Sequence, residues 1–523
     1  MASAARPASP AAGITAPDDD QPALPARNQP LLLVGIMAAS LIQVLDTTIA
    51  NVAIPHMQSS LGATAESVTW VLTSYIIASA VAMPATGWLG DRVGAKRLFI
   101  FSVAGFIIAS MMCGMAQNLG EMVLFRALQG ITGAFIPPLS QSFLLDTSRP
   151  SRHPQMMAIW GLGIMIGPIL GPILGGWLTE SVNWRWVFYV NLPVGALALA
   201  VLLAELPHRE AKARKFDLFG FIMLGIALSS LQLMLDRGAQ LDWFQSGEIW
   251  LYALLSASTA WIAVIHFATG REPLFDTAIF ADRNFVIALI FMLVIGVVMF
   301  ANMALLPPML QRLFGYGVID TGIVLMPRGV GILLSMQLSG LLMRRGFDAR
   351  IIVGTGFVIA AYSQWMMAGW SLAADEWHFI TAGLIQGLGL GLVFIPLNVT
   401  AFSTLPGHLR TDGSSLLNLV RSIGASAGIS VTTVLLAKTI QTAHSEIGGH
   451  VTSATVNALD LSALDRYQAA GETALSMIDM EVNRQAAMIA YIDDFYLMMW
   501  MALAAIPLVF LMRKAAPPKA GPR

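Results

Sequence analysis

A single carboxylate interrupts the first long apolar stretch of the chain. Residues 41–55 read LIQVLDTTIANVAIP, and Asp46 lies inside the otherwise almost wholly apolar run 31–54. At about 100° per residue, the side chains around Asp46 divide into an apolar face and a polar face of one helix. Lipid cannot satisfy a polar face, so it must contact protein or a watery cavity. This face consists of Gln43, Asp46, Thr47, Ala50 and Asn51.

The expected chemistry of Asp46 is proton binding. Burial disfavours the charged form of a carboxylate, and a nearby cation favours it. We therefore expect Asp46 to titrate near neutral pH, with access to one side of a membrane at a time. The alternative is a carboxylate that bonds Thr47, Thr48 or a neighbouring helix and only fixes packing. No other carboxylate is expected to lie as deep, because the remaining candidates fall near the ends of apolar runs: Asp217, Asp236, Asp320 and Asp493.

A second charge, Arg126, lies within the apolar segment LFRALQGITGAF. Arg126, Gln129 and Gly133 share a helix face, so a guanidinium and an amide point the same way above a glycine that permits close helix contact. Arginine stays protonated, which makes it a poor proton carrier but a good fixed charge. Our hypothesis is that Arg126 stabilises ionised Asp46 in one conformation and withdraws in another. The alternative is a structural pairing of Arg126 with carbonyl groups at a helix end.

Two further arginines, Arg328 in LMPRGVG and Arg421 in NLVRSIG, also lie within apolar segments. They are expected either to balance anionic or polar groups of a substrate or to tether helix ends. The sequence does not distinguish these two roles.

Glycines recur at four-residue spacing in GLGIMIGPILGPILGG, residues 161–176. This spacing strips one helix face to backbone and permits close packing, and each proline removes a backbone hydrogen bond. The pattern predicts a tightly packed, mobile hinge surface, and the alternative is a static helix contact. The residues concerned are Gly163, Gly167, Pro168, Gly171, Pro172 and Gly175.

The segment GWLGDRVGAKR, residues 87–97, combines glycines with an acid and bases. Asp91 can accept from exposed helix-terminal N–H groups, and Arg92 and Arg97 follow within one loop. A latch between two parts of the molecule would need charges placed in this way. The alternative is that the basic residues only anchor the loop on one side of a membrane.

The elements that must position these residues are membrane-spanning helices. Hydrophobic residues make up 56% of the 523-residue chain and charged residues only 12%, about half the charged fraction of a soluble protein. Apolar runs long enough to cross a bilayer recur throughout. The chain is therefore predicted to be an all-α integral membrane protein with fourteen spans. They are 31–54, 68–89, 98–117, 121–145, 156–179, 184–206, 216–236, 248–269, 284–310, 319–343, 350–372, 376–399, 414–437 and 493–512.

The lysines and arginines separate by side. With fourteen spans, 21 of the 30 fall in loops on the side of the termini, 6 on the opposite side, and 3 within spans. Because basic loops stay in the cytoplasm, both termini are predicted to be cytoplasmic. The net charge of −1 gives no indication of a nucleic-acid partner, and none is expected.

The predicted organisation has two halves. Residues 129–139, QGITGAFIPPL, resemble residues 386–397, QGLGLGLVFIPL, when a gap is allowed, and transporters with pseudo-symmetric halves show such repeats. The long external loop is expected to hold one or two amphipathic helices, as a solvent-facing cap or as a docking surface for a partner. The predicted parts are a disordered tail 1–30, a six-helix half 31–206, a basic linker with two extra helices 207–269, a second half 270–512 containing the loop 438–492, and a tail 513–523.

Several of these segments together resemble the major facilitator superfamily, specifically the 14-helix drug:proton antiporters of the EmrB/QacA type. LDTTIANVAIP resembles the first-helix motif of that group, GWLGDRVGAKR the loop between helices 2 and 3, RALQGITGAF the fourth-helix motif, and GPILGPILGG the antiporter motif of helix 5. NWRWVFYVNLPVG, LMPRGVG and AYIDDFYLM are also similar to segments of this group. The likeness extends from about residue 31 to residue 512.

This resemblance implies two six-helix halves, two extra linker helices, alternating access and extrusion driven by inward proton flow. Asp46 matches the first-helix acid and Arg126 the fourth-helix arginine. For the EmrB branch the resemblance also implies a periplasmic adaptor and an outer-membrane channel, with the chain in the bacterial inner membrane. In the second half, Arg344 stands where an acid would match Asp91, so the latch is expected to be one-sided.

The favoured function is proton-driven efflux of hydrophobic or amphipathic compounds, with no cofactor. The residues expected to line the substrate path are Gln43, Asn51, Gln129, Phe300, Asn302, Met303 and Arg421. One alternative is an exporter dedicated to one metabolite or self-made toxin, and another is a membrane scaffold or enzyme. An enzyme is disfavoured because the chain lacks a GxxxxGK[ST] loop and HExxH. The eight histidines form no i,i+4 pair, so no metal site is expected.

Overall fold

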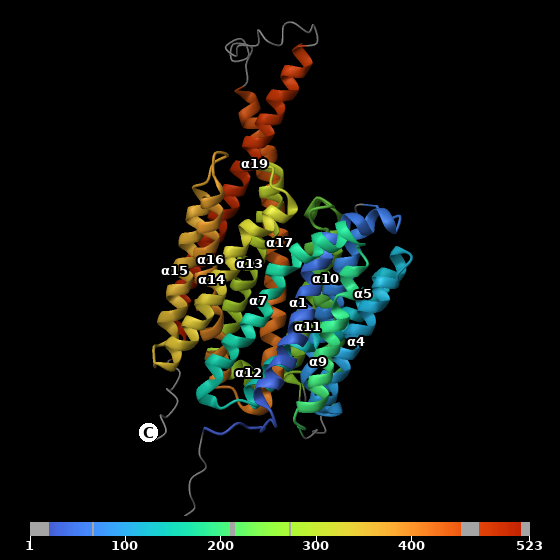
Figure 1. Ribbon diagram of the computed structural model, residues 1–523, viewed down its shortest axis with the longest axis vertical. Helices are drawn as coiled ribbons and strands as arrows, with labels where there is room; N and C mark the ends of the chain where they lie inside the picture. The colour runs from blue at the N-terminus through green and yellow to red at the C-terminus, as the bar shows by residue number, and fades with distance from the viewer. Residues whose placement is uncertain (1–19, 65–66, 210–214, 271–272, 451–469, 514–523) are drawn as a thin grey trace, which may run out of the picture.

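The computed structural model describes residues 20–64, 67–209, 215–270, 273–450 and 470–513, and the regular elements of this part of the chain are helices (Figure 1). Helices are what long apolar segments must form in lipid, because every backbone N–H and C=O group has to be satisfied within the segment.

The helices follow one another along the chain with short connections. Those of the first half are α1 (Gln29–Ser60), α2 (Trp70–Ala82), α3 (Thr86–Leu89), α4 (Ala95–Met115), α5 (Leu119–Ala134), α6 (Ile136–Asp146), α7 (His153–Ser181), α8 (Trp186–Tyr189) and α9 (Asn191–Glu205). The helices after them are α10 (Leu218–Arg237), α11 (Gly247–Thr269), α12 (Ala278–Ala281), α13 (Arg283–Leu313), α14 (Val318–Arg344), α15 (Ala349–Ala368), α16 (Glu376–Ser403), α17 (Arg410–Gly449) and α19 (Ala470–Ala505).

The described residues make fourteen membrane crossings. Thirteen helical stretches are long and apolar enough to cross a bilayer, and one of them, Ser67–Met115, runs over 49 residues. Gly94 breaks that stretch with a φ of 95°, a backbone conformation that favours glycine. The chain therefore crosses once through α2 and α3 and returns through α4, as the fourteen predicted spans require.

Short polar side chains fix where many of these helices begin. An asparagine or aspartate at the N-cap accepts a hydrogen bond from a backbone N–H of the first turn, which satisfies a group that the helix leaves unpaired. Such caps precede α1, α5, α10, α13, α15 and α16, and they are Asn28, Asn118, Asp217, Asp282, Asp348 and Asp375.

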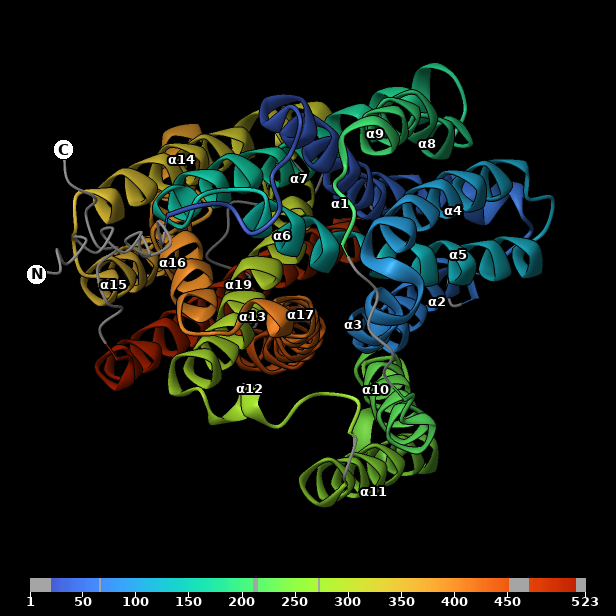
Figure 2. The same ribbon diagram turned by 90° about the horizontal axis from the view of Figure 1, so that it is seen from below.

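The crossings gather into two bundles with a peripheral pair beside them. In the view from below, α1 to α9 lie on one side and α13 to α19 on the other, while α10 and α11 lie at the outer edge (Figure 2). α10 packs against α2 and α17, whereas α11 packs chiefly against α10. The boundaries proposed for the two halves and the linker stay predictions.

Polar contacts join the two bundles on the side where the termini lie (Figure 1). Arg410 at the start of α17 donates to Asp146 at the end of α6 at 2.7 Å, and Arg209 reaches the same carboxylate at 3.4 Å. Ser142 and Thr411 hydrogen-bond at 2.9 Å. These contacts close the terminus side with an acid–base pair that the sequence analysis did not identify.

Glycine at position 87 makes part of this closure possible. A Cβ atom built there would lie 1.4 Å from Oδ1 of Asp412 on α17. A side chain at position 87 therefore fits only if the buried Asp412 carboxylate turns away or α3 and α17 move apart.

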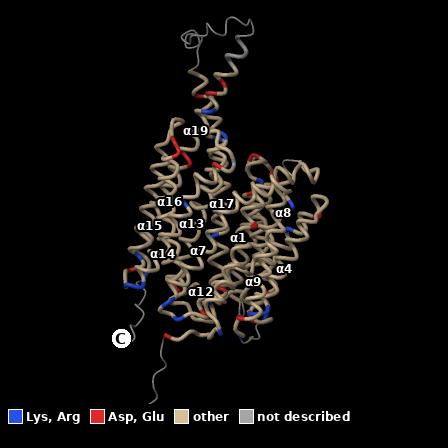
Figure 3. Tube along the Cα trace, in the orientation of Figure 1, with Lys and Arg blue, Asp and Glu red and all other residues tan. Residues whose placement is uncertain are grey.

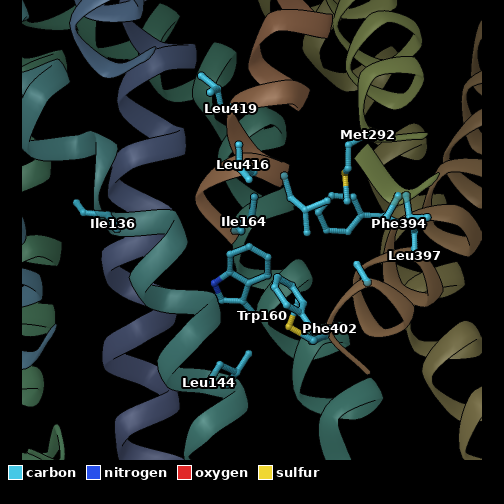
Figure 4. Packing of buried hydrophobic residues seen from close by; sticks show 14 of the residues in the cluster. Ile136, Leu144, Trp160, Ile164, Met292, Phe394, Leu397, Phe402, Leu416 and Leu419 are labelled. Carbon is cyan, nitrogen blue, oxygen red and sulfur yellow. The ribbon is translucent and has the colours of Figure 1, made fainter. Parts of the chain in front are cut away.

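An apolar layer fills the space between the bundles above that seam. Figure 4 shows Trp160 and Ile164 of α7 near Phe402 of α16 and Leu416 of α17. Trp160 is 1% exposed, and its indole N–H donates to Ser40 at 3.1 Å. Large side chains from both bundles thus exclude water from the terminus side of the centre.

The prediction for residues 438–492 is wrong in part. The described residues of this range belong to two long membrane helices rather than to a separate cap, because α17 continues unbroken to Gly449 and α19 begins at Ala470. Their lengths of 40 and 36 residues correspond to about 60 and 54 Å, so both extend beyond a bilayer of about 30 Å on the side opposite the termini (Figure 1). Residues 451–469 lie outside the described part.

Most charged residues lie toward the two ends of the crossings. Figure 3 shows blue and red concentrated there, with a largely uncharged band between. The few charges inside that band are the exceptions that need an explanation.

We predict that replacing Gly87 by valine opens the terminus side. The added side chain would overlap the Asp412 carboxylate, and because that short side chain is only 3% exposed and has little space to turn, we expect α3 and α17 to separate. Spin labels on cysteines placed at the exposed positions Val93 and His408 would report this as a longer inter-label distance, and the native Cys113 is buried.

Gly407 is the matched control, because a Cβ there meets nothing within 4 Å. Gly407→Val should leave the distance distribution as in the unsubstituted chain. Equal distributions for Gly87→Val and Gly407→Val would show that the close approach at Gly87 does not hold the seam.

Candidate functional site

Helices α1, α2, α4, α5 and α9 converge on one buried polar cluster in the first bundle. Its centre is Asp46 on α1, which is 1% exposed, together with Arg126 and Gln129 on α5 and Asn191 at the start of α9, each 0% exposed. Such complete burial of a carboxylate and a guanidinium requires that each find partners within the protein.

Asp46 receives hydrogen bonds from three side chains. Nη1 of Arg126 lies 2.6 Å from Oδ2, while Nε2 of Gln129 and Nδ2 of Asn191 lie 2.8 and 2.9 Å from Oδ1. The structure thus brings together Asp46, Arg126 and Gln129, three of the residues singled out in the sequence.

Arg126 is held on several sides. Its Nε donates to the carbonyl oxygen of Val71 at 3.1 Å, and Nη1 also donates to Oε1 of Gln129 at 2.8 Å. Its guanidinium carbon lies 4.4 Å from the ring centre of Tyr75 and 5.7 Å from that of Phe188. These contacts fix the guanidinium independently of Asp46.

The network determines which way the amides point. An arginine only donates, so the Gln129 atom facing it must be oxygen, and its NH₂ faces Asp46. Ser110 donates to the carbonyl of Phe188 at 2.8 Å and therefore accepts from Asn191 at 3.0 Å, which turns the Asn191 NH₂ toward Asp46.

Asp46 consequently faces donors only. A carboxylate accepts three such bonds readily, whereas a protonated carboxyl would place its own O–H against an N–H group. The hydrogen-bond geometry around Asp46 thus matches a group that accepts on both of its oxygens.

The other residues expected along the substrate path of the first bundle lie outside this cluster. Gln43 donates to the hydroxyl of Tyr75 at 3.2 Å, and Asn51 is exposed. Gln129 is part of the cluster itself, bonded to Asp46, and does not face open space.

The candidates on α13 take two different positions. Asn302 is 0% exposed, donating to the carbonyl of Val298 at 2.8 Å and contacting Sδ of Met498 on α19 at 3.1 Å. Phe300 and Met303 are partly buried. Asn302 therefore points into its own bundle.

Arg421 lies at a small gap between the bundles. Its Nη2 donates to Oδ1 of Asn418 at 3.0 Å, and the gap beside it leaves no room for a water molecule, whereas ligand sites typically have about 300–1,000 Å³. Asn418 also donates to Gln141 of α6 at 3.1 Å, so both bundles contribute. The lining residues are Gln141, Met292, Phe394, Asn398, Leu417, Asn418 and Arg421.

Arg328 is separate from both sites. Its Nη2 donates to the carbonyl oxygen of Met299 on α13 at 3.0 Å, and within the described residues it has no carboxylate partner. This contact fits the alternative in which the arginine ties two helices together.

The glycine face of α7 packs against α1. Cβ atoms built at Gly167 and Gly171 would lie 2.9 Å from Val44 and 2.1 Å from Thr48 respectively, and Gly163 and Gly175 approach the same helix. Thr48 also donates to the carbonyl of Gly167 at 3.3 Å. The helix that carries Asp46, α1, thus packs closely against the glycine face of α7. The hinge role of Pro168 and Pro172 stays a prediction.

The predicted latch residues lie beside the seam described above. Arg92 stacks over Trp88 at 5.4 Å, and Arg97 is exposed. Asp91 is half-buried at the end of the second crossing, one turn from Gly87. The latch role of these three residues stays a prediction, whereas Asp146 and Arg410 form a direct ion pair between the bundles.

Sequence reasoning missed several members of the cluster. Asn191 lies within the quoted segment NWRWVFYVNLPVG, and its polar side chain next to an apolar run was an available signal. Tyr75 and Ser110 carried no comparable signal, because one tyrosine or serine in a span is common.

The expectation that no other carboxylate lies as deep in the membrane as Asp46 stays a prediction, but a second carboxylate in a predicted span is equally buried in protein. Asp494 on α19 is also 1% exposed. Its neighbour Asp493 is exposed, and the sequence gives no way to decide which of two adjacent aspartates faces the bundle.

Comparisons with known proteins agree with this architecture. Residues 36–429 match the model of the Major Facilitator Superfamily. The chain is 32% identical over 496 residues to the "Multidrug export protein EmrB" of Escherichia coli (strain K12), covering 93% of this chain and 95% of that protein. It is 34% identical over 490 residues to the "Fatty acid resistance protein FarB" of Neisseria gonorrhoeae, covering 92% and 94%.

A solved structure shares the fold. The human organic anion transporter MFSD10 (TETRAN) superposes with a TM-score of 0.59 at 13% identity, covering 92% of this chain and 99% of that one. Together, these matches and the fourteen crossings show that the chain is a multi-pass membrane transporter, rather than an enzyme, and belongs to the major facilitator superfamily, in its EmrB/QacA-type group.

Proposed function

We propose that this chain exports hydrophobic or amphipathic small molecules from the cytoplasm or inner leaflet in exchange for protons, without a cofactor. Relatives at 32–34% identity named for multidrug export and fatty acid resistance support the substrate class. The proton gradient supplies the driving force in this proposal, and Asp46 is the proton carrier.

The observation that carries the proposal is the set of donors around Asp46. Three N–H groups favour the ionised carboxylate in the arrangement described, and the pair with Arg126 is buried from water. If α1 and α5 move apart, Asp46 loses its cation and protonation becomes favourable. Protonation and helix movement are thereby linked, because each state of the carboxyl prefers a different arrangement.

The Lys and Arg distribution supports cytoplasmic termini in the bacterial inner membrane. The side closed by Asp146, Arg410 and the Gly87 contact is then the cytoplasmic side, and the arrangement is closed inward. Protons would enter from outside, and α7, packed on α1 in one bundle and on α14 in the other, would carry movement between them.

A periplasmic adaptor and an outer-membrane channel are also part of the proposal. The projecting ends of α17 and α19 support it, because they extend past the bilayer on the side opposite the termini. Paired helices of that length would give a partner of helical hairpins a surface to pack on.

A narrower substrate range is the second candidate. Arg421 lies where the two bundles pack together, with an amide and no carboxylate as partner among the described residues. An amphipathic acid, whether one metabolite or a self-made toxin, would supply the missing anion.

We predict that Asp46→Asn abolishes uphill efflux of lipophilic fluorescent dyes from proteoliposomes with an imposed pH gradient. Asparagine keeps the shape of the protonated carboxyl but cannot exchange a proton, so downhill dye flux should persist. Asp276→Asn, at an exposed loop carboxylate, is the control and should pump normally. Uphill pumping by Asp46→Asn at the wild-type rate would contradict the coupling role.

Arg126→Lys is expected to move the pH profile of efflux toward alkaline pH by about 1 unit. Lysine keeps the charge but cannot bond Asp46, Gln129 and the Val71 carbonyl at once in a fixed fork. Ionised Asp46 would then be less well stabilised. A profile identical to that of the unsubstituted protein would remove Arg126 as the partner that sets proton affinity.

For Arg421→Gln, the two substrate ranges predict different results. If the substrate is an amphipathic acid, export of fluorescent fatty acids should fall at least about tenfold, as loss of a charge-assisted hydrogen bond implies, while export of uncharged dyes persists. Arg328→Gln is the control, because that arginine bonds only a carbonyl in the described structure. Equal effects on acids and neutral dyes would exclude the anion-pairing role.

A further inference from the structure

Asp494 is a second buried carboxylate that the mechanism above does not use. It lies on α19, is 1% exposed, and neither of its oxygens has a hydrogen-bond partner among the described residues. An ionised carboxylate in this position would be buried without a donor or a cation, which is far more costly than burying a neutral carboxyl.

Amide groups surround the next turn of the same helix. Met498, four residues on from Asp494, contacts Nδ2 of Asn302 on α13 at 3.1 Å and Nε2 of Gln364 on α15 at 3.6 Å. The oxygens Oδ1 of Asn302 and Oε1 of Gln364 are both buried without a partner. The second bundle therefore holds two unpaired amide oxygens on helices that pack on α19, and both amides contact Met498, one turn along α19 from the unpaired acid. A protonated carboxyl has one O–H to donate.

The charged groups near Asp494 do not favour its ionised form over its neutral form. On α19, the exposed Asp493 repels a second negative charge, and Tyr491 is buried one turn outward. Arg312 at the end of α13 lies near Tyr491 and is exposed. From the other helices packed on α19, Tyr362 of α15 and Lys438 of α17 are exposed. Within the described residues, none of these cations forms an ion pair with Asp494.

The buried polar residues of the second bundle lie on the same crossings as those of the first bundle, but the acid is on the sixth crossing instead of the first. Asp46, Gln129 and Asn191 lie on the first, fourth and sixth crossings of their bundle, and Asn302, Gln386 and Asp494 lie on the corresponding crossings of the second. Gln386 begins the segment that repeats the one begun by Gln129. The first bundle pairs its acid with an arginine, whereas the acid of the second bundle has no hydrogen-bond partner among the described residues.

We propose that Asp494 is a second proton-binding site of the transporter, which holds a proton in the arrangement where Asp46 is ionised against Arg126. The inference rests on the proposed proton-coupled export, and it adds a second proton to those that each export cycle would move.

The proton exchange involves only water and the carboxyl. Asp494 lies about 10 Å below the outward end of α13, because the Asn302–Met498 contact fixes the level of α19 against α13. A proton from water on that side adds to one carboxylate oxygen, and the O–H then donates to an amide oxygen. Movement of α19 away from α13 and α15 would admit water and let the proton leave.

Infrared difference spectroscopy of the full-length protein in lipid tests this directly. Spectra recorded at about pH 5 and about pH 9 should contain a C=O stretching band of a buried protonated carboxyl that Asp494→Asn removes. Asp493→Asn, which changes the exposed neighbour, should keep the band. Asp494→Glu should shift the frequency of the band. This second variant therefore tests the assignment of the band to Asp494 even if Asp494→Asn does not fold. A band unchanged in both Asp494 variants would overturn the proposal.

Asp46→Asn separates this result from the coupling role of Asp46. The Asp494 band should survive that substitution, so the two sites can succeed or fail independently. In proteoliposomes with membrane voltage clamped, loss of one coupled proton should lower the steady-state dye gradient about tenfold per unit of pH gradient. Equal gradients for Asp494→Asn and the unsubstituted protein would show that the bound proton is not transported.

Discussion

The structure depends on one electrostatic constraint, which is that the charge of Asp46 has to be compensated at every stage in a place that water does not reach. In the arrangement described, Arg126, Gln129 and Asn191 compensate it from two other helices. Removing one member of a buried ion pair costs about 3–5 kcal/mol. A cost of that size is enough to decide between two conformations of a transporter, so the protonation state of one carboxyl can select which arrangement the bundles adopt.

The rest of the architecture holds that constraint in place. α1 carries Asp46 and lies in backbone contact with the glycine face of α7, and α7 in turn packs on α14 of the other bundle. Side chains of α1, among them Met37, Val44 and Thr48, lie directly against those glycines, so a displacement of α1 toward α7 would press on the backbone of α7. The ion pair of Asp146 with Arg410 and the layer around Trp160 close the terminus side at the same time. In the proposed mechanism, these contacts are the ones that would join protonation of Asp46 to closure of the terminus side.

Much of this fold could be predicted from the sequence because the membrane restricts the possibilities. Apolar length fixed the fourteen crossings, and Asp46, Arg126 and Gln129 were identified because polar groups in lipid need partners. The failures have equally physical causes. Whether Asp493 or Asp494 faces the bundle depends on the rotation of α19, and the extension of α17 to Gly449 depends on packing beyond the bilayer. Hydropathy records neither of these.

The central claim is that Asp46 exchanges a proton when the bundles move and a substrate binds. Proton release from purified protein in weakly buffered detergent, recorded with a pH indicator on addition of an exported dye, tests it most directly. The account predicts that the unsubstituted protein releases protons when the dye is added, and that Asp46→Asn releases one proton fewer per molecule. Equal release from both proteins would contradict it.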